Sequence, residues 1–293
     1  MGFGAIGMRL AVAGIVCCAM PADAAGEKGV VAMPKNRLTV NGDAIQLKYF
    51  RALLHDNAEG LLDMRRELRI LITDREVPTD ALEGLAMLPV LQMARDGKVQ
   101  GLLIKLDPDD TGVVYVTLLH KPVEPQVSLM TQTLSSSNKD LIRNFKVTGG
   151  FVAGSMERNE DGNSFFADMP TMGLAIDFNI PLDDIPAITS NMKGSEARKS
   201  VQAAMLVKRG DALMRKDFAL LRTIVTDGSY RRSEALLSNP AFQEILPEMG
   251  AEIKKSADHI SRLIVRGNRA VIAFDDNSWN EFSRENGEWK FEN

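Results

Sequence analysis

The chain has 293 residues, of which 45% are hydrophobic and 25% are charged. These proportions are typical of globular proteins and exclude a chain that is mainly disordered or fibrous, while the length favours two domains of ordinary size. The formal net charge is -4 and the basic residues are scattered, so we expect no nucleic-acid partner.

The first 24 residues have the pattern of a secretory signal peptide. Arg9 supplies a positive charge, and an uncharged apolar stretch follows over residues 10–20. That stretch is too short to cross a bilayer, which needs about 20 residues. Small residues before the junction predict cleavage between Ala24 and Ala25. The sequence therefore predicts a periplasmic or secreted protein whose mature chain has no transmembrane segment.

The two cysteines, Cys17 and Cys18, both lie inside the predicted signal peptide. The mature chain would then have no thiol and no disulfide, and its stability would come from packing alone. Residues 25–36 are small, charged or helix-breaking, so we expect a flexible leader there. Ordered structure is expected to begin near Arg37.

A β-rich domain is predicted over residues 37–180. Apolar and polar residues alternate on both sides of Asn41-Gly42, a pair that favours the positive φ angles of a tight hairpin turn. The first two strands are expected at 37–41 and 44–54. Similar alternation predicts further strands at 67–73, 102–106, 113–120, 127–134, 147–157, 164–168 and 174–180.

One helical insert interrupts this series of strands. Apolar residues at spacings of three and four predict a helix over residues 80–95, which Pro89 should kink or split in two. Seven to nine strands with one helical insert favour a β-sandwich or a flattened barrel.

A domain boundary is predicted at residues 181–195, which contain two prolines and show no sustained periodicity. Residues 196–293 then form the second domain, with helices first and an antiparallel sheet after them, so the fold class is α+β. The helices are expected at 196–215, from a cap at Asp217, and at 240–255 with an interruption at Pro247. Two hairpins are expected at 260–265 with 269–274, and at 279–284 with 289–292.

This second domain resembles the NTF2-like superfamily, also called the cystatin-like cone. The resemblance rests on Asp217-Phe218 with Leu221, Val225 and Asp227, on Val265–Val271, and on Asn286–Phe291, in that order. It implies that the helices pack into the concave side of a curved antiparallel sheet. The first domain resembles a group of exported bacterial β-rich domains that open with a Leu38–Gly42 hairpin, and that resemblance implies no activity.

A candidate ligand pocket is predicted at the mouth of the cone, formed by Tyr230, Trp279, Phe282 and His259. Aromatic residues in a small curved sheet are more often part of the core, so both interpretations stay open. NTF2-like enzymes use a buried Asp/His pair, but Asp258 and His259 are adjacent and would face opposite sides of a strand. We therefore assign no catalytic residue.

No metal or cofactor site is expected. The histidines His55, His120 and His259 are far apart in the sequence, and we expect them at strand edges or on the surface. Asp107–Asp110 resembles part of a calcium loop but lacks the glutamate that should stand at position 118. No nucleophile elbow or phosphate-binding loop is present in the sequence.

The leading hypothesis is a non-enzymatic exported protein that binds a small apolar ligand, a peptide or a partner protein. One alternative is an isomerase or hydrolase that uses a buried carboxylate in the NTF2-like cone. Another is an envelope assembly factor that acts through its sheet edges by strand addition.

Overall fold

The computed structural model describes residues 36–57, 59–62, 64–121, 131–134, 142–158 and 171–292. The predicted signal peptide, nearly all of the predicted leader and the predicted strand at 164–168 lie outside these residues. The chain divides into two compact units, Met1–Ala32 and Met33–Asn293, and every described residue belongs to the second. No helix among the described residues is both long enough and apolar enough to cross a membrane.

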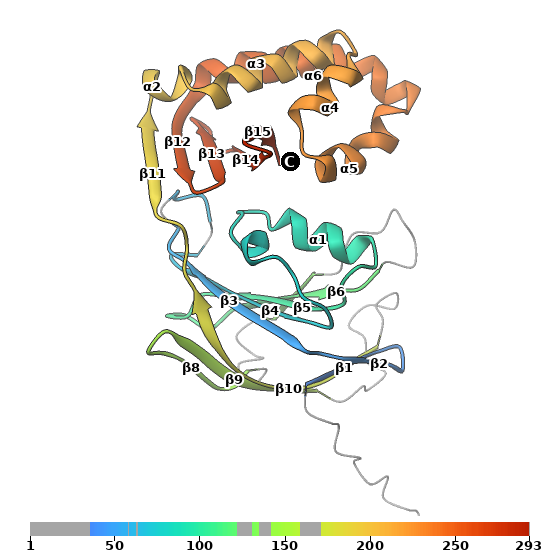
Figure 1. Ribbon diagram of the computed structural model, residues 1–293, viewed down its shortest axis with the longest axis vertical. Coiled ribbons are helices and arrows are strands. Elements are labelled where there is room, and N and C mark those ends of the chain that lie inside the picture. The colour runs from blue at the N-terminus through green and yellow to red at the C-terminus, as the bar shows by residue number, and fades with distance from the viewer. Residues whose placement is uncertain are drawn as a thin grey trace, which may run out of the picture. The chain divides into compact units, whose positions relative to one another are not determined.

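The described part of residues 37–183, here called the N-terminal lobe, contains ten strands that form one hydrogen-bonded sheet (Figure 1). The order along the sheet is β2-β1-β10-β3-β4-β5-β6-β7, and β9 and β8 extend it from β10. The strands are β1 (Arg37–Val40), β2 (Asp43–Gln46), β3 (Tyr49–His55), β4 (Glu67–Thr73), β5 (Gly101–Leu106), β6 (Val114–Leu119), β7 (Thr131–Leu134), β8 (Arg143–Thr148), β9 (Phe151–Arg158) and β10 (Met172–Asp183).

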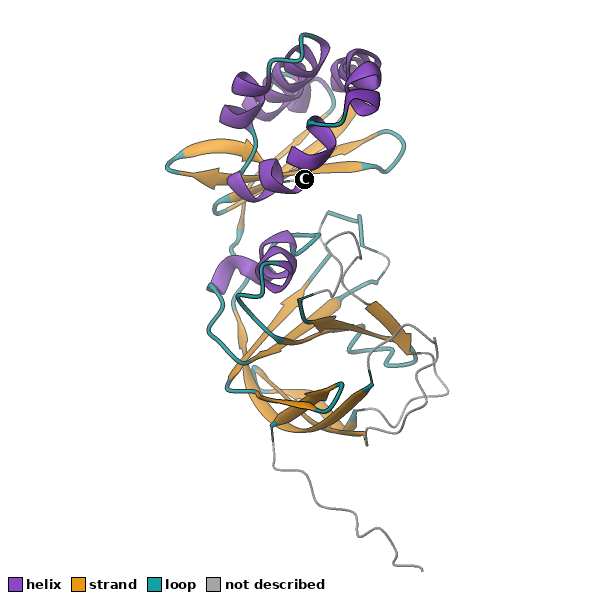
Figure 2. Cartoon of the chain, turned by 90° about the vertical axis from the view of Figure 1, so that its right-hand side faces the viewer, coloured by secondary structure: helices purple, strands orange, loops and turns teal. Residues whose placement is uncertain are grey.

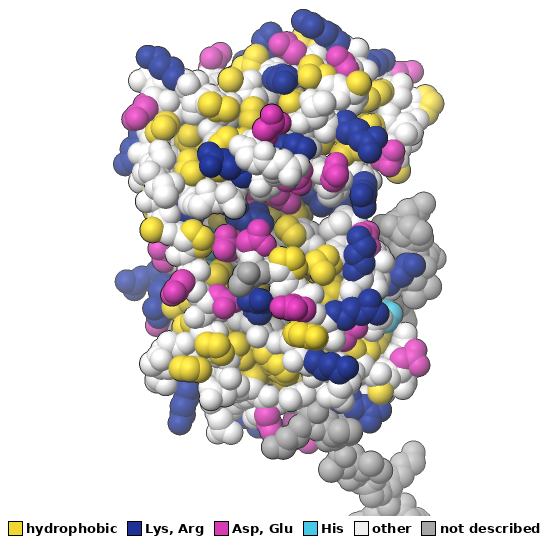
Figure 3. Space-filling model, in the orientation of Figure 1, with side chains coloured by type: hydrophobic (Ala, Val, Ile, Leu, Met, Phe, Trp, Pro, Cys, Tyr) yellow, Lys and Arg dark blue, Asp and Glu magenta, His cyan; other side chains and the backbone are white. Residues whose placement is uncertain are grey.

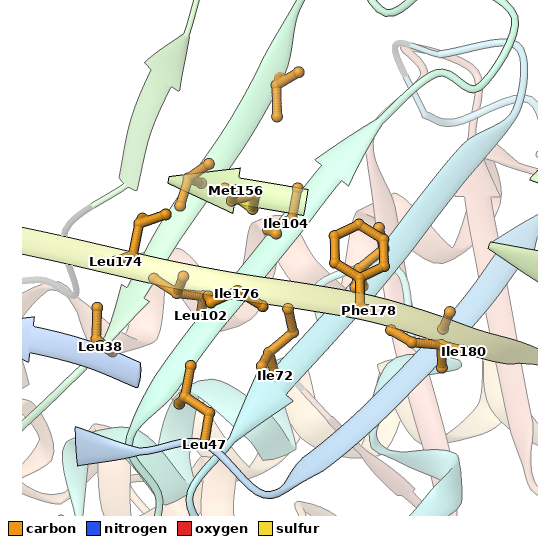
Figure 4. Close-up of a cluster of buried hydrophobic side chains, with 14 of the residues drawn as sticks. Leu38, Leu47, Ile72, Leu102, Ile104, Met156, Leu174, Ile176, Phe178 and Ile180 are labelled. Atoms are coloured by element: carbon orange, nitrogen blue, oxygen red, sulfur yellow. The ribbon is translucent and has the colours of Figure 1, made fainter. Parts of the chain in front are cut away.

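This sheet curls, so that its two halves face each other across a hydrophobic core. Ile176 and Phe178 of β10 lie against side chains of β4 and β5 such as Ile72 and Ile104, as Figure 4 shows. The alternation that predicted β4 places Leu68, Ile70 and Ile72 in this core, as expected. The curl depends on a parallel contact between β10 and β3, at Leu182↔Ala52 and Asp183↔Leu53, which the expectation of antiparallel neighbours did not include.

The predicted strand at 44–54 is two strands, β2 and β3. β2 pairs with β1, whereas β3 pairs with β4, so the chain changes sheet halves at Leu47 and Lys48. Leu47 is buried in the core and the Lys48 N–H donates to the Thr73 carbonyl at 2.8 Å. A change of hydrogen-bonding partner leaves no trace in the alternation of apolar residues, which is why the sequence did not reveal the break.

The predicted strand at 147–157 is also wrong in its limits. Gly149 and Gly150 both have positive φ and form a turn between β8 and β9. Glycine is favoured at such positions because it lacks a Cβ. The hairpin therefore forms at these glycines, and residues 159–163, between the predicted strands at 147–157 and 164–168, lie outside the described residues.

The helical insert covers the outer face of β3–β6. It consists of a 3-10 turn, η1 (Thr79–Leu82), and a helix, α1 (Leu88–Arg95). The predicted split is confirmed, since Pro89 lies in the first turn of α1, where its missing N–H costs nothing. Apolar residues of the insert form a second hydrophobic cluster with Leu53, Leu71 and Leu103 on the outer face of the sheet. β4 is thus buried on both faces.

Residues 188–292, here called the C-terminal lobe, contain five helices and a five-stranded antiparallel sheet of order β11-β12-β13-β14-β15. The helices are α2 (Ser195–Arg198), α3 (Val201–Met214), α4 (Phe218–Ile224), α5 (Asp227–Leu237) and α6 (Pro240–Ser256), followed by a 3-10 turn, η3 (Ala257–His259). The strands are β11 (Ile188–Lys193), β12 (Ile260–Arg266), β13 (Arg269–Phe274), β14 (Trp279–Glu285) and β15 (Glu288–Phe291).

The helices lie on one side of this sheet (Figure 2) and share a hydrophobic core with it. The predicted cap at Asp217 is confirmed, because its side chain accepts a hydrogen bond from the Leu220 N–H at 2.9 Å. α6 continues through Pro247 without the predicted interruption. Both predicted hairpins are present, and the α+β class is confirmed.

Two elements of this lobe were not predicted. α5 follows α4 after two residues, Val225 and Thr226, and the Thr226 hydroxyl caps it by accepting from the Ser229 N–H at 3.2 Å. β11 lies within residues 181–195, the segment predicted as an irregular linker, and pairs with β12. A polar strand of this kind is suited to the edge of a sheet, because an edge strand pairs with a neighbour on one side only and its other side faces solvent.

The contact between α3 and α6 predicts the effect of adding one methyl group. A Cβ on Gly210 would lie 2.6 Å from the Gly250 carbonyl oxygen, whereas a Cβ on Gly228 would make only an ordinary 3.5 Å contact. Both glycines are helical, so alanine is favoured intrinsically at both by up to about 1 kcal/mol. We expect Gly210→Ala to lower the free energy of unfolding by about 1–3 kcal/mol, and Gly228→Ala to leave it unchanged or raise it. Urea denaturation followed by circular dichroism measures both, and equal effects would contradict the close helix contact.

Candidate functional site

A buried ionic cluster lies where the outer face of β4 meets the helical insert. Arg69 has no exposure to solvent, although β4 is a strand of alternating leucine and isoleucine. Its Nε donates to the Glu67 carboxylate at 2.7 Å, and its Nη1 donates to the carbonyl oxygens of Leu82 and Gly84. The guanidinium therefore ties the turn after η1 to the sheet, and Arg69 is partnered by both charge and backbone.

The same turn is bound from its other side by β13 and β14 of the C-terminal lobe. Glu281 accepts from the Leu85 N–H at 2.9 Å, and Arg269 donates to the Asp80 carbonyl at 3.2 Å. Arg269 also lies 3.7 Å from the Glu281 carboxylate. Burial raises the pKa of Glu281, an effect that Arg269 and the backbone N–H groups oppose. Gly84 leaves the space for this contact, since a Cβ there would lie 2.8 Å from the Glu281 carboxylate.

A second part of the cluster is built on the segment that follows β3. His55 is buried, and its Nδ1 accepts a hydrogen bond from the Asn57 N–H at 3.1 Å. Because a backbone N–H only donates, the proton of the neutral ring is on Nε2. Burial lowers the pKa of His55, and the charge of Arg69 lowers it further, so the ring is neutral at pH 7.

The Nε2 of His55 faces Glu59, whose nearer carboxylate oxygen is 3.8 Å away. Glu59 is also buried, and its other oxygen accepts from Arg266 of β12 at 3.0 Å. Arg266 donates in addition to the Asp56 carboxylate at 2.8 Å and to the Pro186 carbonyl at 3.3 Å. The Glu59 oxygen that faces His55 has no hydrogen-bond partner among the described residues.

These groups surround a cavity of about 20 Å³, lined by the ionisable residues His55, Glu59, Glu83, Arg266, Arg269 and Glu281 together with apolar neighbours. A volume of about 10–15 Å³ is enough for one water molecule, so the cavity is too small for an organic substrate. Burial raises the pKa of Glu83 here, as it does that of Glu281. The cluster therefore joins the two lobes by ion pairs and hydrogen bonds, and it does not form a binding pocket.

The expectation that the histidines lie at edges or on the surface is wrong for His55. Its side chain, Asp56 and Glu59 offer nitrogen and oxygen atoms within 4.8 Å of one another, a spacing that suits a metal ion. However, a metal at Nε2 would require the ring proton to move to Nδ1, which already accepts the Asn57 N–H. Arg266 also forms an ion pair with each of the two carboxylates and so already occupies one oxygen of each. The arrangement fits a hydrogen-bonded ion cluster better than a metal site.

An open groove of about 580 Å³ lies beside the cluster. Its lining contains three carboxylates, from Asp56, Asp183 and Asp184, against the one guanidinium of Arg266, a net charge of -2. The rest of the lining is Leu54, Gly150, Leu182, Ile185, Ala187 and Ile188. Asp184 is exposed, and its carboxylate makes no hydrogen bond or ion pair with the described residues. The groove is thus both acidic and apolar.

Two features border this groove. On one side lies a smaller cavity of about 240 Å³, which shares Asp183 and contains Tyr49 and Phe50; Arg51 pairs with Asp183 there at 3.4 Å. On the other side, Ile188 is the first residue of β11. Among the described strands β11 pairs with β12 alone, so its other edge has no partner strand there, and Figure 1 shows β11 at the edge of the sheet. Ile188 places the start of this edge at the groove.

The four residues of the predicted cone pocket lie in different surroundings. Phe282 has no exposure and packs against Phe291 with ring centroids 4.4 Å apart, in the core shared with the helices. Trp279 is an odd number of positions away on β14 and so points to the opposite face. Tyr230 is half-buried below Arg222, and the exposed His259 lies 3.6 Å from Asp275. The structure does not bring Phe282 and Trp279 together, and the pocket stays a prediction.

The basic side chains do not gather into one patch on the face shown in Figure 3, where they alternate with acidic and apolar groups.

The predicted calcium-like turn contains an ion pair, since Arg66 donates to both oxygens of Asp109 at 2.9 and 2.7 Å. Sequence reasoning missed Arg69, Glu59, Arg266 and Glu281. Arg69 donates to carbonyl groups 13 and 15 positions away, and the pairs Glu59–Arg266 and Glu281–Leu85 are about 200 positions apart. The one local signal was Arg69, a charged residue inside a strongly apolar strand.

The buried Arg69 and the exposed Arg66 provide a matched pair of substitutions. Arg69→Met leaves the buried Glu67 carboxylate without its counter-ion, so we expect a loss of about 3–5 kcal/mol in the free energy of unfolding. Arg66→Met removes a surface pair and should cost at most about 1 kcal/mol. The double variant Glu67→Leu/Arg69→Met should recover part of the loss, because no unpaired charge remains. Urea denaturation measures all three, and similar values for the two single variants would refute the role given to Arg69.

The chain matches no family model, no curated protein and no solved structure.

Proposed function

We propose that this protein is a non-enzymatic, exported binding protein that holds an extended, positively charged peptide segment of a partner protein. The observation that carries the proposal is the groove at Asp183–Ile188, whose net charge of -2 is combined with apolar side chains. Opposite charges across an interface favour the correct partner and speed its association. Lysine or arginine side chains flanked by apolar residues are the complement of this surface.

The open edge of β11 supports an extended conformation for the bound segment. An exposed strand edge presents unpaired N–H and C=O groups, which a peptide can pair with by adding a strand to the sheet. Ile188 belongs to both the groove and β11. A peptide paired with β11 would therefore bring its neighbouring side chains to the acidic groove.

We prefer binding to catalysis because the side of the C-terminal sheet that faces the helices is filled by apolar side chains. In the described residues, the core between this sheet and the helices is formed by hydrophobic side chains such as Ile272, Phe282 and Phe291. The buried carboxylate of Glu281 lies on the opposite face and is bonded to the insert. An enzyme with a carboxylate inside the cone therefore receives no support from these residues.

We also propose that the C-terminal lobe is an NTF2-like domain. The supporting features are the helices on one side of an antiparallel sheet and the Asn286-Gly287 hairpin, in the order that the resemblance implies. Because folds of this kind carry many functions, this assignment adds nothing to the choice of ligand.

The groove predicts preferential binding of basic, extended peptides. We expect a ten-residue peptide of alternating lysine and valine, with both ends blocked, to bind more tightly than the same peptide with glutamate in place of lysine. Asp184→Lys should weaken binding of the lysine peptide by about tenfold or more, which corresponds to about 1.4 kcal/mol. Isothermal titration calorimetry at low and high salt measures this, and the affinity should fall as salt screens the charges.

Glu244→Lys is the matched control, because Glu244 is an exposed residue of α6 that does not line the groove. It changes the net charge of the protein by the same amount and should leave the affinity unchanged. Equal weakening by the two variants would mean that only the overall charge matters. Equal affinity for the lysine and glutamate peptides would rule out the proposed ligand class.

A further inference from the structure

We propose that His55 is an acid-sensitive latch: a proton added to its ring at Nδ1 breaks the hydrogen bond from Asn57 and releases residues 56–57 and 59–62, here called the segment, which join the two lobes. This inference concerns regulation and does not depend on the peptide-binding function. It rests on the position of one ring nitrogen and on what the following segment contacts.

The first step is the competition for Nδ1. The neutral ring carries its proton on Nε2 and uses the Nδ1 lone pair to accept the Asn57 N–H at 3.1 Å. The only place for a second proton is therefore that same lone pair. A protonated Nδ1 is a donor and would face the Asn57 N–H, another donor. Protonation of His55 and the hydrogen bond to Asn57 thus exclude each other.

The second step is the dependence of the segment on Asn57. This residue has a left-handed backbone with φ of 48°. Its side-chain oxygen accepts from the N–H groups of Leu61 and Leu62, at 3.1 and 3.0 Å. Its side-chain nitrogen donates to the carbonyl oxygens of Leu62 and Met64, at 3.0 and 2.7 Å. The fold of the segment is therefore organised around Asn57, next to the histidine.

The third step is what the segment holds. Glu59 and Asp56 accept from Arg266 of β12, and the Glu59 carbonyl accepts from Arg262 at 3.4 Å. These contacts join the segment to the C-terminal lobe. Asp56 and Arg266 also line the acidic groove, so release of the segment would alter one wall of the groove.

The charges that face His55 come from three elements. Arg69 of β4, itself paired with Glu67, and Arg266 of β12 disfavour the protonated ring, whereas Glu59 and Asp56 of its own segment favour it. Glu83, Arg269 and Glu281 complete the cavity wall. Burial is the largest effect on the ring and acts against its charged form.

The sign of the pH dependence follows from this. The pKa of His55 is lower in the folded protein than the ordinary value of 6.5, so below about pH 6.5 the unfolded chain binds a proton that the folded chain does not. The contribution of His55 to stability is then complete above that pH and is lost as the pH falls towards the folded pKa. Within that window the unfolding equilibrium constant should rise by up to about tenfold for each unit by which the pH is lowered.

The experiment compares hydrogen exchange and urea unfolding of the full chain at about pH 7.5 and about pH 5.5, which bracket an ordinary histidine pKa. In the wild type, the amides of Asn57, Leu61 and Leu62 should lose about tenfold or more in protection at the lower pH, after correction for intrinsic exchange. His55→Asn keeps an acceptor atom at the position of Nδ1 but does not titrate, so the protection of these three amides should be unchanged between the two pH values. His259→Asn is the control at an exposed histidine and should behave as the wild type.

Two results would overturn the latch. One is unchanged protection of the three amides in the wild type, which needs no variant and decides the question even if His55→Asn does not fold. The other is a folded His55→Asn protein with the same acid sensitivity as the wild type, which would assign the effect to carboxylates. Binding of the lysine peptide enters neither result, so failure of the latch and failure of the proposed function are distinguishable.

Discussion

A guanidinium that is completely removed from water must find partners inside the protein, and this constraint at Arg69 organises the structure around it. Unpaired, such a charge would cost several kcal/mol. The Nε of Arg69 donates to a carboxylate of its own strand, and its Nη1 donates to the carbonyl oxygens of Leu82 and Gly84, whereas its Nη2 has no hydrogen-bond partner among the described residues. Burial of apolar residues alone would let the insert between β4 and β5 pack on the sheet in several positions. The hydrogen bonds from Arg69 fix the position of its turn.

The same turn is the part of the insert that the C-terminal lobe contacts. Its carbonyl groups point to Arg69, and its N–H groups at Leu85 and Ala86 point to Glu281. The 3-10 turn and the residues after it leave backbone N–H and carbonyl groups without partners inside a helix. The N-terminal lobe binds the carbonyl groups, and the C-terminal lobe binds the N–H groups. The segment after β3 makes a second connection of the same kind through Glu59 and Arg266. Both connections are ionic and buried, so they specify one arrangement of partners more than they add stability.

Charged side chains make the hydrogen bonds that join the lobes at this cluster, and this has a consequence for function. Ion pairs surround a small cavity here, and a proton added to His55, which lines that cavity, would change the charges of the contact. The groove beside it keeps its acidic residues at the surface, where Asp184 has no partner among the described residues. Charges that are buried here hold the lobes, and charges that are exposed here remain available to a ligand.

Patterns local in the sequence predicted the elements that depend on local physics. The alternation around β4, the turns at Asn41-Gly42 and Asn286-Gly287, the cap at Asp217 and the split at Pro89 follow from side-chain periodicity, positive φ and a missing N–H. The α+β class follows from their order. The break between β2 and β3, the parallel contact of β10 with β3 and the strand nature of β11 depend on distant partners, so the sequence pattern did not contain them.

The same division holds for the site. The sequence determined which residues carry charge, and the position of Arg69 inside an apolar strand was a local signal that the sequence-based prediction did not use. Only the tertiary structure decided that His55 is buried beside Glu59, that Arg266 reaches a segment about two hundred positions earlier, and that Glu281 binds the backbone of the insert. The physical reason is that burial and pairing are set by the groups that folding brings together, and those groups are far apart along the chain.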